Sequence, residues 1–190
     1  MLGPDDVLAF RPRRITVAGT SGAGKSVLAR RISALTGSAY TEIDALFHGP
    51  DWTTRPTFEA DVEAVLATDA WVIDWQYGFA RPLIADRAEL CVFLDLPRRR
   101  VLGQVTRRTI RRRLTRERLW GVVTEPPLWT FVTDRDHIIR WSWRTWPKTR
   151  RLVAELAQSH PRLPLVRLQS HEEAERWLTG PLAGSLSHRS

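Results

Sequence analysis

Apolar residues along this chain follow two periods, and their order predicts strands that alternate with helices. Short apolar runs, most continuous at 90–95, are typical of strands buried on both faces of a sheet. Between these runs, apolar residues recur every three or four positions, as they do on one face of a helix. The expected strands are 13–18, 39–44, 71–74, 90–95 and 163–168, and the expected helices are 27–36, 57–67, 136–158, 171–179 and an arginine-rich one after Pro97.

A proline and a pair of helix-capping residues refine this pattern. Pro147 lies inside the expected helix 136–158 and should kink or split it. Ser170 precedes the last expected helix, and Glu173 stands three residues later, as in a capping box. Strands that alternate with helices imply parallel pairing and right-handed crossovers. We therefore expect an α/β fold of three layers around a five-stranded parallel sheet.

The same pattern predicts the domain organisation. The length of 190 residues fits one domain, which we place at residues 1–180. The stretch from Gly180 is small and polar, so we expect 181–190 to be a disordered tail. Proline-containing, irregular sequence after the arginine-rich helix predicts a lid at about 109–130.

Charge is concentrated in one segment. The chain carries a net charge of +8, whereas residues 98–118 alone contain ten arginines against one acid, a net charge of +9. This distribution argues against a uniformly basic nucleic-acid-binding surface, and guanidinium groups suit bidentate contacts with phosphate. No apolar run approaches the roughly 20 residues that a membrane helix needs, and Cys91 is the single cysteine. We expect a cytoplasmic protein with no membrane partner.

One motif carries specific chemistry, because the run from Gly19 to Ser26 has the pattern G-x-x-x-x-G-K-[ST] between a strand and a helix. Glycines let the backbone wrap around phosphate oxygens, and its N–H groups point inward at the positive end of the next helix. Lys25 should reach the β- and γ-phosphates, and Ser26 should ligate Mg²⁺. The predicted ATP-binding residues are Gly19, Thr20, Ser21, Gly22, Ala23, Gly24, Lys25, Ser26 and Val27.

With this loop in place, the chain resembles the P-loop small-molecule and nucleoside-monophosphate kinases. Within them it is most similar to the adenylate-kinase-related group often labelled DNA topology modulation protein. The resemblance runs from Ile15 to Leu178, and after the glycine loop it rests on Ile43–Phe47, Trp71–Asp74 and Phe93–Arg98. It implies a P-loop NTPase fold with an acceptor-binding arm and an arginine-bearing lid, and ATP and Mg²⁺ as cofactors.

The resemblance also implies roles for two acids. Asp74 matches the carboxylate that holds the Mg²⁺ shell, and the carboxyl end of a central strand does face the crevice of the glycine loop. Asp44 matches the carboxylate that contacts the acceptor hydroxyl, which a kinase needs to orient the attacking oxygen and accept its proton. Arg55 and Arg81 follow these acids in loops and could anchor an anionic acceptor. The plainer alternatives are turn or cap aspartates and solvated arginines.

The lid arginines complete the expected site. Arg108 follows the fourth strand at a spacing that resembles the lid arginine of these kinases, and Arg113 lies in the lid itself. Mobile guanidiniums that close over the γ-phosphate would neutralise charge in the transition state; the alternative is a solvated basic helix face. Two positions depart from the group: Trp75 replaces a glycine and should lie beside the acceptor pocket, and Gln104 replaces a nucleotide-contacting arginine.

Three functions are compatible with these residues. The first is a phosphotransferase, with Lys25, Asp44, Arg108 and Arg113 as catalytic groups and a small molecule or nucleotide as acceptor. The second is a nucleotide-dependent regulator or slow ATPase that uses the arginine segment on nucleic acid, which the charge distribution makes the weaker reading. The third is a binding protein that retains nucleotide and has lost acceptor chemistry. The acceptor-side acids favour the first, and the sequence does not predict the oligomeric state.

Overall fold

The computed structural model describes the backbone over most of the chain. The described backbone covers residues 1–49, 53–115, 118–119, 123–124 and 138–187, and the described side chains exclude 109–144. Among these residues, no helix is both long and apolar enough to cross a membrane.

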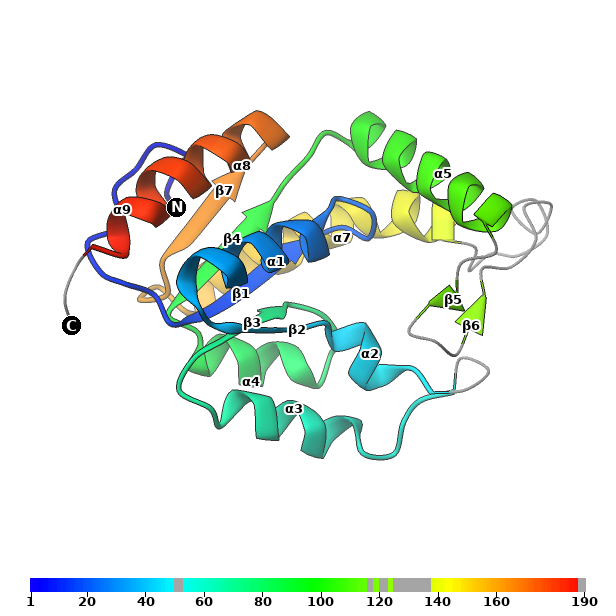
Figure 1. Ribbon diagram of the computed structural model, residues 1–190, viewed down its shortest axis with the longest axis horizontal. Helices are drawn as coiled ribbons and strands as arrows, with labels where there is room; N and C mark the ends of the chain where they lie inside the picture. Colours follow the sequence, from blue (N-terminus) through cyan, green and yellow to red (C-terminus); the bar gives the residue numbers. More distant parts are fainter. Residues whose placement is uncertain (50–52, 116–117, 120–122, 125–137, 188–190) are drawn as a thin grey trace.

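A five-stranded parallel sheet forms the centre of the molecule (Figure 1). Its strand order is β2-β3-β1-β4-β7, with β1 in the middle. Ile15 of β1 pairs with Val72 on one side and with Leu90 on the other. The strands are β1 (Arg14–Gly19), β2 (Ala39–Thr41), β3 (Trp71–Asp74), β4 (Leu90–Leu94) and β7 (Leu165–Leu168), and a separate antiparallel pair is β5 (Arg118–Leu119) with β6 (Val123–Thr124). The predicted sheet of five parallel strands is confirmed.

Helices cover both faces of this sheet. The helices are α1 (Lys25–Thr36), α2 (Ile43–Phe47), α3 (Phe58–Leu66), α4 (Ala80–Arg87), α5 (Arg98–Thr115), α7 (Ile138–Ser159), α8 (His171–Trp177), η2 (Leu178–Leu182) and α9 (Ala183–Ser185). Helices α1, α5 and α8 contribute to one buried apolar cluster, and α3, α4 and α7 contribute to the other. Side chains alternate along β1, so Val17 belongs to the first cluster and Ala18 to the second. The three predicted layers are therefore present.

Two short helices differ from the sequence-based expectation. Residues 43–47, expected to end a strand and begin a loop, form α2, and residues 80–87, for which no element was expected, form α4. Both are too short for a helical period to stand out, and Pro82 lies in the first turn of α4, where proline is tolerated. Helix α7 runs continuously through Pro147 rather than splitting there.

The chain end is also more ordered than expected. Instead of a disordered tail from residue 181, the helix continues through η2 and α9, and the expectation was wrong up to Ser187. Leu182 and Ser185 are 0% and 1% exposed, because they pack under the helices that precede them. Ser170 does cap α8, since its hydroxyl accepts from the Glu173 N–H at 3.0 Å.

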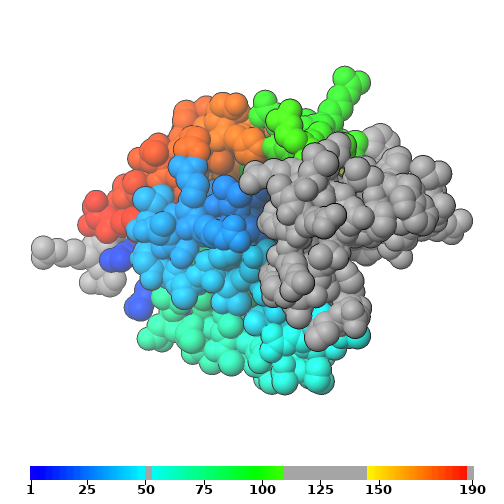
Figure 2. Space-filling view, turned by 45° about the vertical axis from the view of Figure 1, so that its right-hand side comes forward, coloured from blue at the N-terminus to red at the C-terminus, as the bar shows by residue number. Residues whose placement is uncertain are grey.

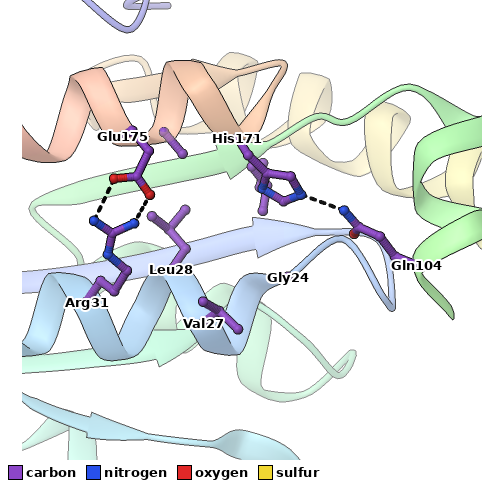
Figure 3. A pocket seen from close by; sticks show the side chains of 9 residues that line it. Gly24, Val27, Leu28, Arg31, Gln104, His171 and Glu175 are labelled. Atoms are coloured by element: carbon purple, nitrogen blue, oxygen red, sulfur yellow. Dashed lines mark hydrogen bonds and ion pairs between the residues drawn. The ribbon is translucent and has the colours of Figure 1, made fainter. Parts of the chain in front are cut away.

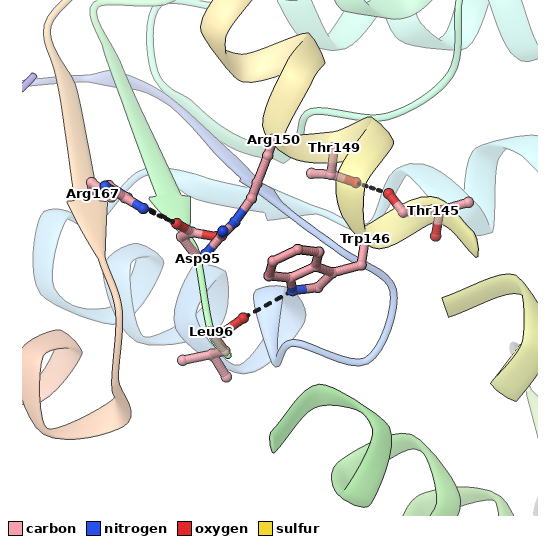
Figure 4. Close-up of polar contacts among 7 residues, drawn as sticks. All are labelled: Asp95, Leu96, Thr145, Trp146, Thr149, Arg150 and Arg167. Carbon is pink, nitrogen blue, oxygen red and sulfur yellow. Dashed lines mark hydrogen bonds and ion pairs between the residues drawn. The ribbon is translucent and has the colours of Figure 1, made fainter. Parts of the chain in front are cut away.

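A buried carboxylate connects three elements at the end of β4 (Figure 4). Asp95 is 3% exposed, and its Oδ1 accepts from Arg150 Nε of α7 at 2.6 Å. Its Oδ2 accepts from Arg167 of β7 through Nε at 2.8 Å and Nη2 at 2.6 Å. The Arg150 guanidinium lies 3.9 Å from the centroid of Trp146, whose Nε1 donates to the Leu96 carbonyl. This network fixes α7 to the sheet.

Candidate functional site

The glycine loop leaves β1 at the carboxyl end of the central strand. Gly22 and Gly24 have φ values of +84° and +100°, a left-handed backbone that glycine adopts without strain. The Ala23 N–H donates to the Thr20 carbonyl at 3.0 Å, and Gly24 is the N-cap of α1. The loop therefore places backbone N–H groups at the positive end of a helix dipole, an arrangement that binds anions.

Helix α5 leans directly on this loop. A Cβ at Gly22 would lie 1.9 Å from Cγ2 of Val105, a residue that is 0% exposed. This separation is far inside van der Waals contact, so the close approach of α5 requires glycine here. The sequence showed why a glycine suits the phosphate loop, but not that this one also accommodates a helix from 80 residues later.

Lys25 is buried at the loop, where several nearby charges act on it. Lys25 is 7% exposed, and its carbon chain passes over Gly19, where a Cβ would lie 3.2 Å from Lys25 Cγ. Burial lowers the pKa of Lys25; the carboxylates of Asp74 and Asp44 raise it, and the nearby charge of Arg108 lowers it. A buried ammonium beside a guanidinium is unfavourable unless an anion joins them. The pair thus provides the electrostatics of a polyphosphate site.

Asp74 and Ser26, the two predicted metal ligands, meet at one hydroxyl. Tyr40 of β2 donates to Asp74 Oδ2 at 3.0 Å and also hydrogen-bonds Ser26. Burial raises the pKa of Tyr40, so its hydroxyl remains protonated and available as a donor. Burial likewise raises the pKa of Asp74 to about 6, and the charge of Lys25 opposes this rise. Both residues therefore hydrogen-bond the same tyrosine, which was not predicted from the sequence, and their role as metal ligands stays a prediction.

The residues present fit a magnesium ion that arrives with nucleotide. Oδ1 of Asp74 is buried and has no hydrogen-bond partner among the described residues. In that same part of the chain, no cluster of three or more His, Cys, Asp or Glu could hold a metal by itself. Mg²⁺ typically takes one or two protein oxygens and completes its shell with phosphate and water. The Ser26 hydroxyl and the unpaired Asp74 oxygen match that requirement.

Asp44 lies at the start of α2, within a group of polar and aromatic side chains. Its Oδ1 accepts from Tyr77 at 2.6 Å and from Gln76 Nε2 at 2.8 Å. The Tyr77 hydroxyl is also 3.3 Å from His48 Nε2. Tyr77 has a φ of +60°, a left-handed conformation that bulky residues rarely adopt and that occurs mostly where structure around a site enforces it.

The other predicted acceptor residues have partners within the chain. Arg55 donates to Asp61 at 3.2 Å and to the Ala45 carbonyl at 3.3 Å. The Arg81 guanidinium lies 5.6 Å from the Trp75 ring centroid. Trp75 is 9% exposed and belongs to the same apolar cluster as Phe58, so the expectation that its indole borders the acceptor pocket stays a prediction. The role predicted for the two arginines stays a prediction.

The predicted lid falls largely outside the described residues. The backbone of α5 extends through Arg113, but the side chain of Arg113 is outside the described part, as is most of 109–130. Its catalytic role therefore stays a prediction, as does that of Arg108, whose charge lowers the pKa of Lys25.

A pocket of about 280 Å³ opens next to the glycine loop (Figure 3). Gly24 and Val27 of the loop and α1 form one side, and Gln104 of α5 hydrogen-bonds His171 of α8 across it. Arg31 of α1 forms an ion pair with Glu175 of α8 at the opposite end. Figure 2 shows α8 (orange) directly above α1 (blue) on this face. Val27 is 62% exposed, so it presents an apolar surface beside the loop.

The pocket also contains residues that were not predicted from the sequence. His171 and Glu175 were read as helix positions, because their proximity to Gly24 depends on how α8 packs beside α1. Tyr40 and Tyr77 were missed for the same reason, since each meets its acid across more than 30 residues of sequence. Gln104 was singled out as a departure, and the structure places it at the mouth of the pocket.

Comparison with solved structures identifies the fold. A shikimate kinase from Acinetobacter baumannii, in complex with shikimate, matches with a TM-score of 0.53 at 15% identity, over 88% of this chain and 89% of that one. A gluconokinase from Sinorhizobium meliloti 1021 matches with a TM-score of 0.50 at 19% identity, over 94% and 99% of the two chains. No family model and no curated protein matches the sequence. The chain therefore has the three-layer fold of P-loop kinases.

Proposed function

We propose that this protein is an ATP- and Mg²⁺-dependent phosphotransferase that acts on a small-molecule or nucleotide acceptor. The observation that carries the proposal is the position of Lys25, which is buried at the glycine loop where the charges of Asp74, Asp44 and Arg108 all shift its pKa. Cations on the phosphate side and a carboxylate on the acceptor side are what in-line phosphoryl transfer requires. The two kinases with similar folds support this reading.

In this proposal the nucleotide lies along the glycine loop. Loop N–H groups and Lys25 bind the phosphates, and the base enters the pocket between Val27, Gln104 and His171. Ser26 and Asp74 would hold Mg²⁺, which neutralises phosphate charge when bound.

The acceptor side supplies the nucleophile. Asp44 accepts a hydrogen bond from the acceptor hydroxyl and takes its proton as the oxygen attacks the γ-phosphorus. The bond between that phosphorus and the β,γ-bridging oxygen breaks, and ADP leaves. Arg108 and, in our proposal, Arg113 stabilise the charge on the transferring group. The hydrogen bonds from Gln76 and Tyr77 hold the Asp44 carboxylate in one orientation.

An acceptor screen tests the proposal. ADP release would be measured with nucleoside monophosphates, nucleosides, sugars and small hydroxy acids, using Lys25→Ala as the inactive control. We expect at least one acceptor to raise turnover well above the rate with water. If wild-type protein binds ATP but no acceptor raises its turnover, the phosphotransferase reading is wrong.

The nucleic-acid alternative gains no support from the described contacts. Of the arginines that α5 carries, Arg98 lies 6.0 Å from the Trp146 ring centroid and Arg100 forms a 3.3 Å ion pair with Glu172. Both guanidiniums thus contact other parts of the same chain.

A further inference from the structure

We infer that the acceptor is a neutral polyhydroxylated compound, such as a sugar or sugar alcohol, rather than a phosphorylated or carboxylated one. This inference rests on the proposed phosphotransferase function and specifies the substrate class of the site around Asp44. Three observations carry it: the chemistry of the polar groups around Asp44, the aromatic wall behind them, and the partners of the neighbouring arginines.

The polar groups at Asp44 are suited to binding hydroxyls. Gln76 can both donate and accept, the Tyr77 hydroxyl can do the same, and a carboxylate accepts from hydroxyl donors. Both groups donate to Asp44 Oδ1, Gln76 Nε2 at 2.8 Å and the Tyr77 hydroxyl at 2.6 Å. Burial lowers the pKa of His48, so this imidazole is neutral at pH 7 and adds no positive charge. A hydroxyl-rich ligand would satisfy such groups, and an anion would repel the carboxylate.

An aromatic wall stands behind these polar groups. The Tyr77 ring stacks on Phe47 with centroids 4.1 Å apart, and Phe58 meets both rings edge-on at 5.0 to 5.3 Å. Rigid rings beside a few convergent polar groups are the usual composition of small-molecule pockets. Because the Tyr77 ring is stacked on Phe47, the hydroxyl that contacts Asp44 is held in place before any ligand binds.

Arg55, the arginine that follows Asp44 in the sequence, already has partners. It is bound to Asp61 and to the Ala45 carbonyl, whereas Arg81 stacks over the Trp75 ring. An anionic acceptor that used Arg55 would have to compete with Asp61. The charges of Asp74, Asp44 and Glu42 all raise the pKa of Lys25, so three carboxylates lie on this side of the site. A second anion would increase the repulsion.

Matched acceptor pairs test the inference. Each pair would contain a neutral compound and the same skeleton with an acid or phosphate group: glucose with gluconate and glucose 6-phosphate, ribose with ribose 5-phosphate, and adenosine with AMP. We expect kcat/KM for the best neutral compound to exceed that of its anionic partner at least tenfold. A preferred anionic member would overturn the inference and leave the phosphotransferase proposal standing, whereas failure of every acceptor would overturn both.

Two tyrosine variants provide a second readout. Tyr77→Phe removes one hydroxyl at Asp44, and Tyr40→Phe makes the same chemical change at Asp74. We expect Tyr77→Phe to raise the acceptor KM about tenfold with the KM for ATP unchanged, because one hydrogen bond to a charged group is lost. We expect Tyr40→Phe to change the Mg²⁺ and ATP dependence instead. Equal effects of the two variants on the acceptor KM would contradict the placement of the acceptor.

Discussion

Asp74 is a single residue whose burial lowers the stability of the folded protein at neutral pH. It is 2% exposed, Tyr40 donates to one of its oxygens, and the other oxygen has no partner among the described residues. Burial raises its pKa from 3.8 to about 6, so the folded state binds this proton more tightly than the unfolded state does. The stability that Asp74 contributes is therefore complete below about pH 4 and is lost as the pH rises through 6.

Replacement of Asp74 by Asn should remove this pH dependence. In nucleotide-free protein, we expect Asp74→Asn to gain about 3 kcal/mol in unfolding free energy over the wild type between pH 4 and pH 7.5. Urea unfolding across this range measures the difference. Asp69→Asn, a change at an exposed aspartate, serves as the control and should shift stability by less than about 0.5 kcal/mol. A wild-type to Asp74→Asn difference that does not vary with pH would contradict the assignment.

Lys25 gives a second prediction for a single residue. We expect Lys25→Ala to weaken Mg²⁺·ATP binding at least about a hundredfold, because a buried charge partner of the phosphates is removed. The far-ultraviolet circular dichroism should be unchanged, because burial of the charged ammonium is unfavourable and its removal does not destabilise the fold. Titration with labelled ATP gives the affinity, and Lys148→Ala, a change at the other lysine, is the matched control and should bind normally. Tight binding by Lys25→Ala would exclude the glycine loop as the phosphate site.

At the scale of elements, the contact between Val105 and Gly22 couples the helix that leads toward the predicted lid to the phosphate loop. The coupling is steric, because no other residue type leaves room for Val105 at this distance. A change in the position of α5 must therefore change the loop as well.

Gly22→Ala should damage nucleotide binding through this contact. We expect at least a tenfold loss in Mg²⁺·ATP affinity, part of which Val105→Ala should restore in the double variant. The control is Gly37→Ala, which has a similar φ of +76° but nothing within 4 Å of the added Cβ. It should lose about 1 kcal/mol of stability from backbone strain and retain its affinity. If the double variant binds no better than Gly22→Ala, the steric account is wrong.

The hydrogen-bond network around Asp95 predicts how much the attachment of α7 to the sheet contributes to stability. Asp95→Ala leaves two guanidiniums without their carboxylate, and we expect a loss of about 2 kcal/mol in unfolding free energy, below the 3–5 kcal/mol of fully buried pairs because both arginines are 39% exposed. Glu172→Ala breaks the exposed pair with Arg100 and should leave the urea midpoint unchanged. Equal midpoints for both variants would show that the network does not secure α7.

At the scale of the whole molecule, the sequence predicted what depends on local pattern. The five strands and the glycine loop follow from apolar runs and from one motif, because each is encoded in consecutive residues. Asp44 was placed on a strand and not on α2, since five helical residues show no period. The hydroxyls of Tyr40 and Tyr77 reach their acids only after β2, β3 and α2 have packed, so sequence spacing carried no sign of them.

The segment around Leu2 pairs with the outer edge of β7, the last strand of the sheet. Leu2 donates its N–H to the Leu165 carbonyl at 2.7 Å and accepts from Arg167 N–H at 2.9 Å, covering the outer edge of β7. An uncovered strand edge invites pairing with other chains. Leu2 precedes its partner by more than 160 residues in the sequence, so the outer edge of β7 is covered only after the sheet between these two segments has folded.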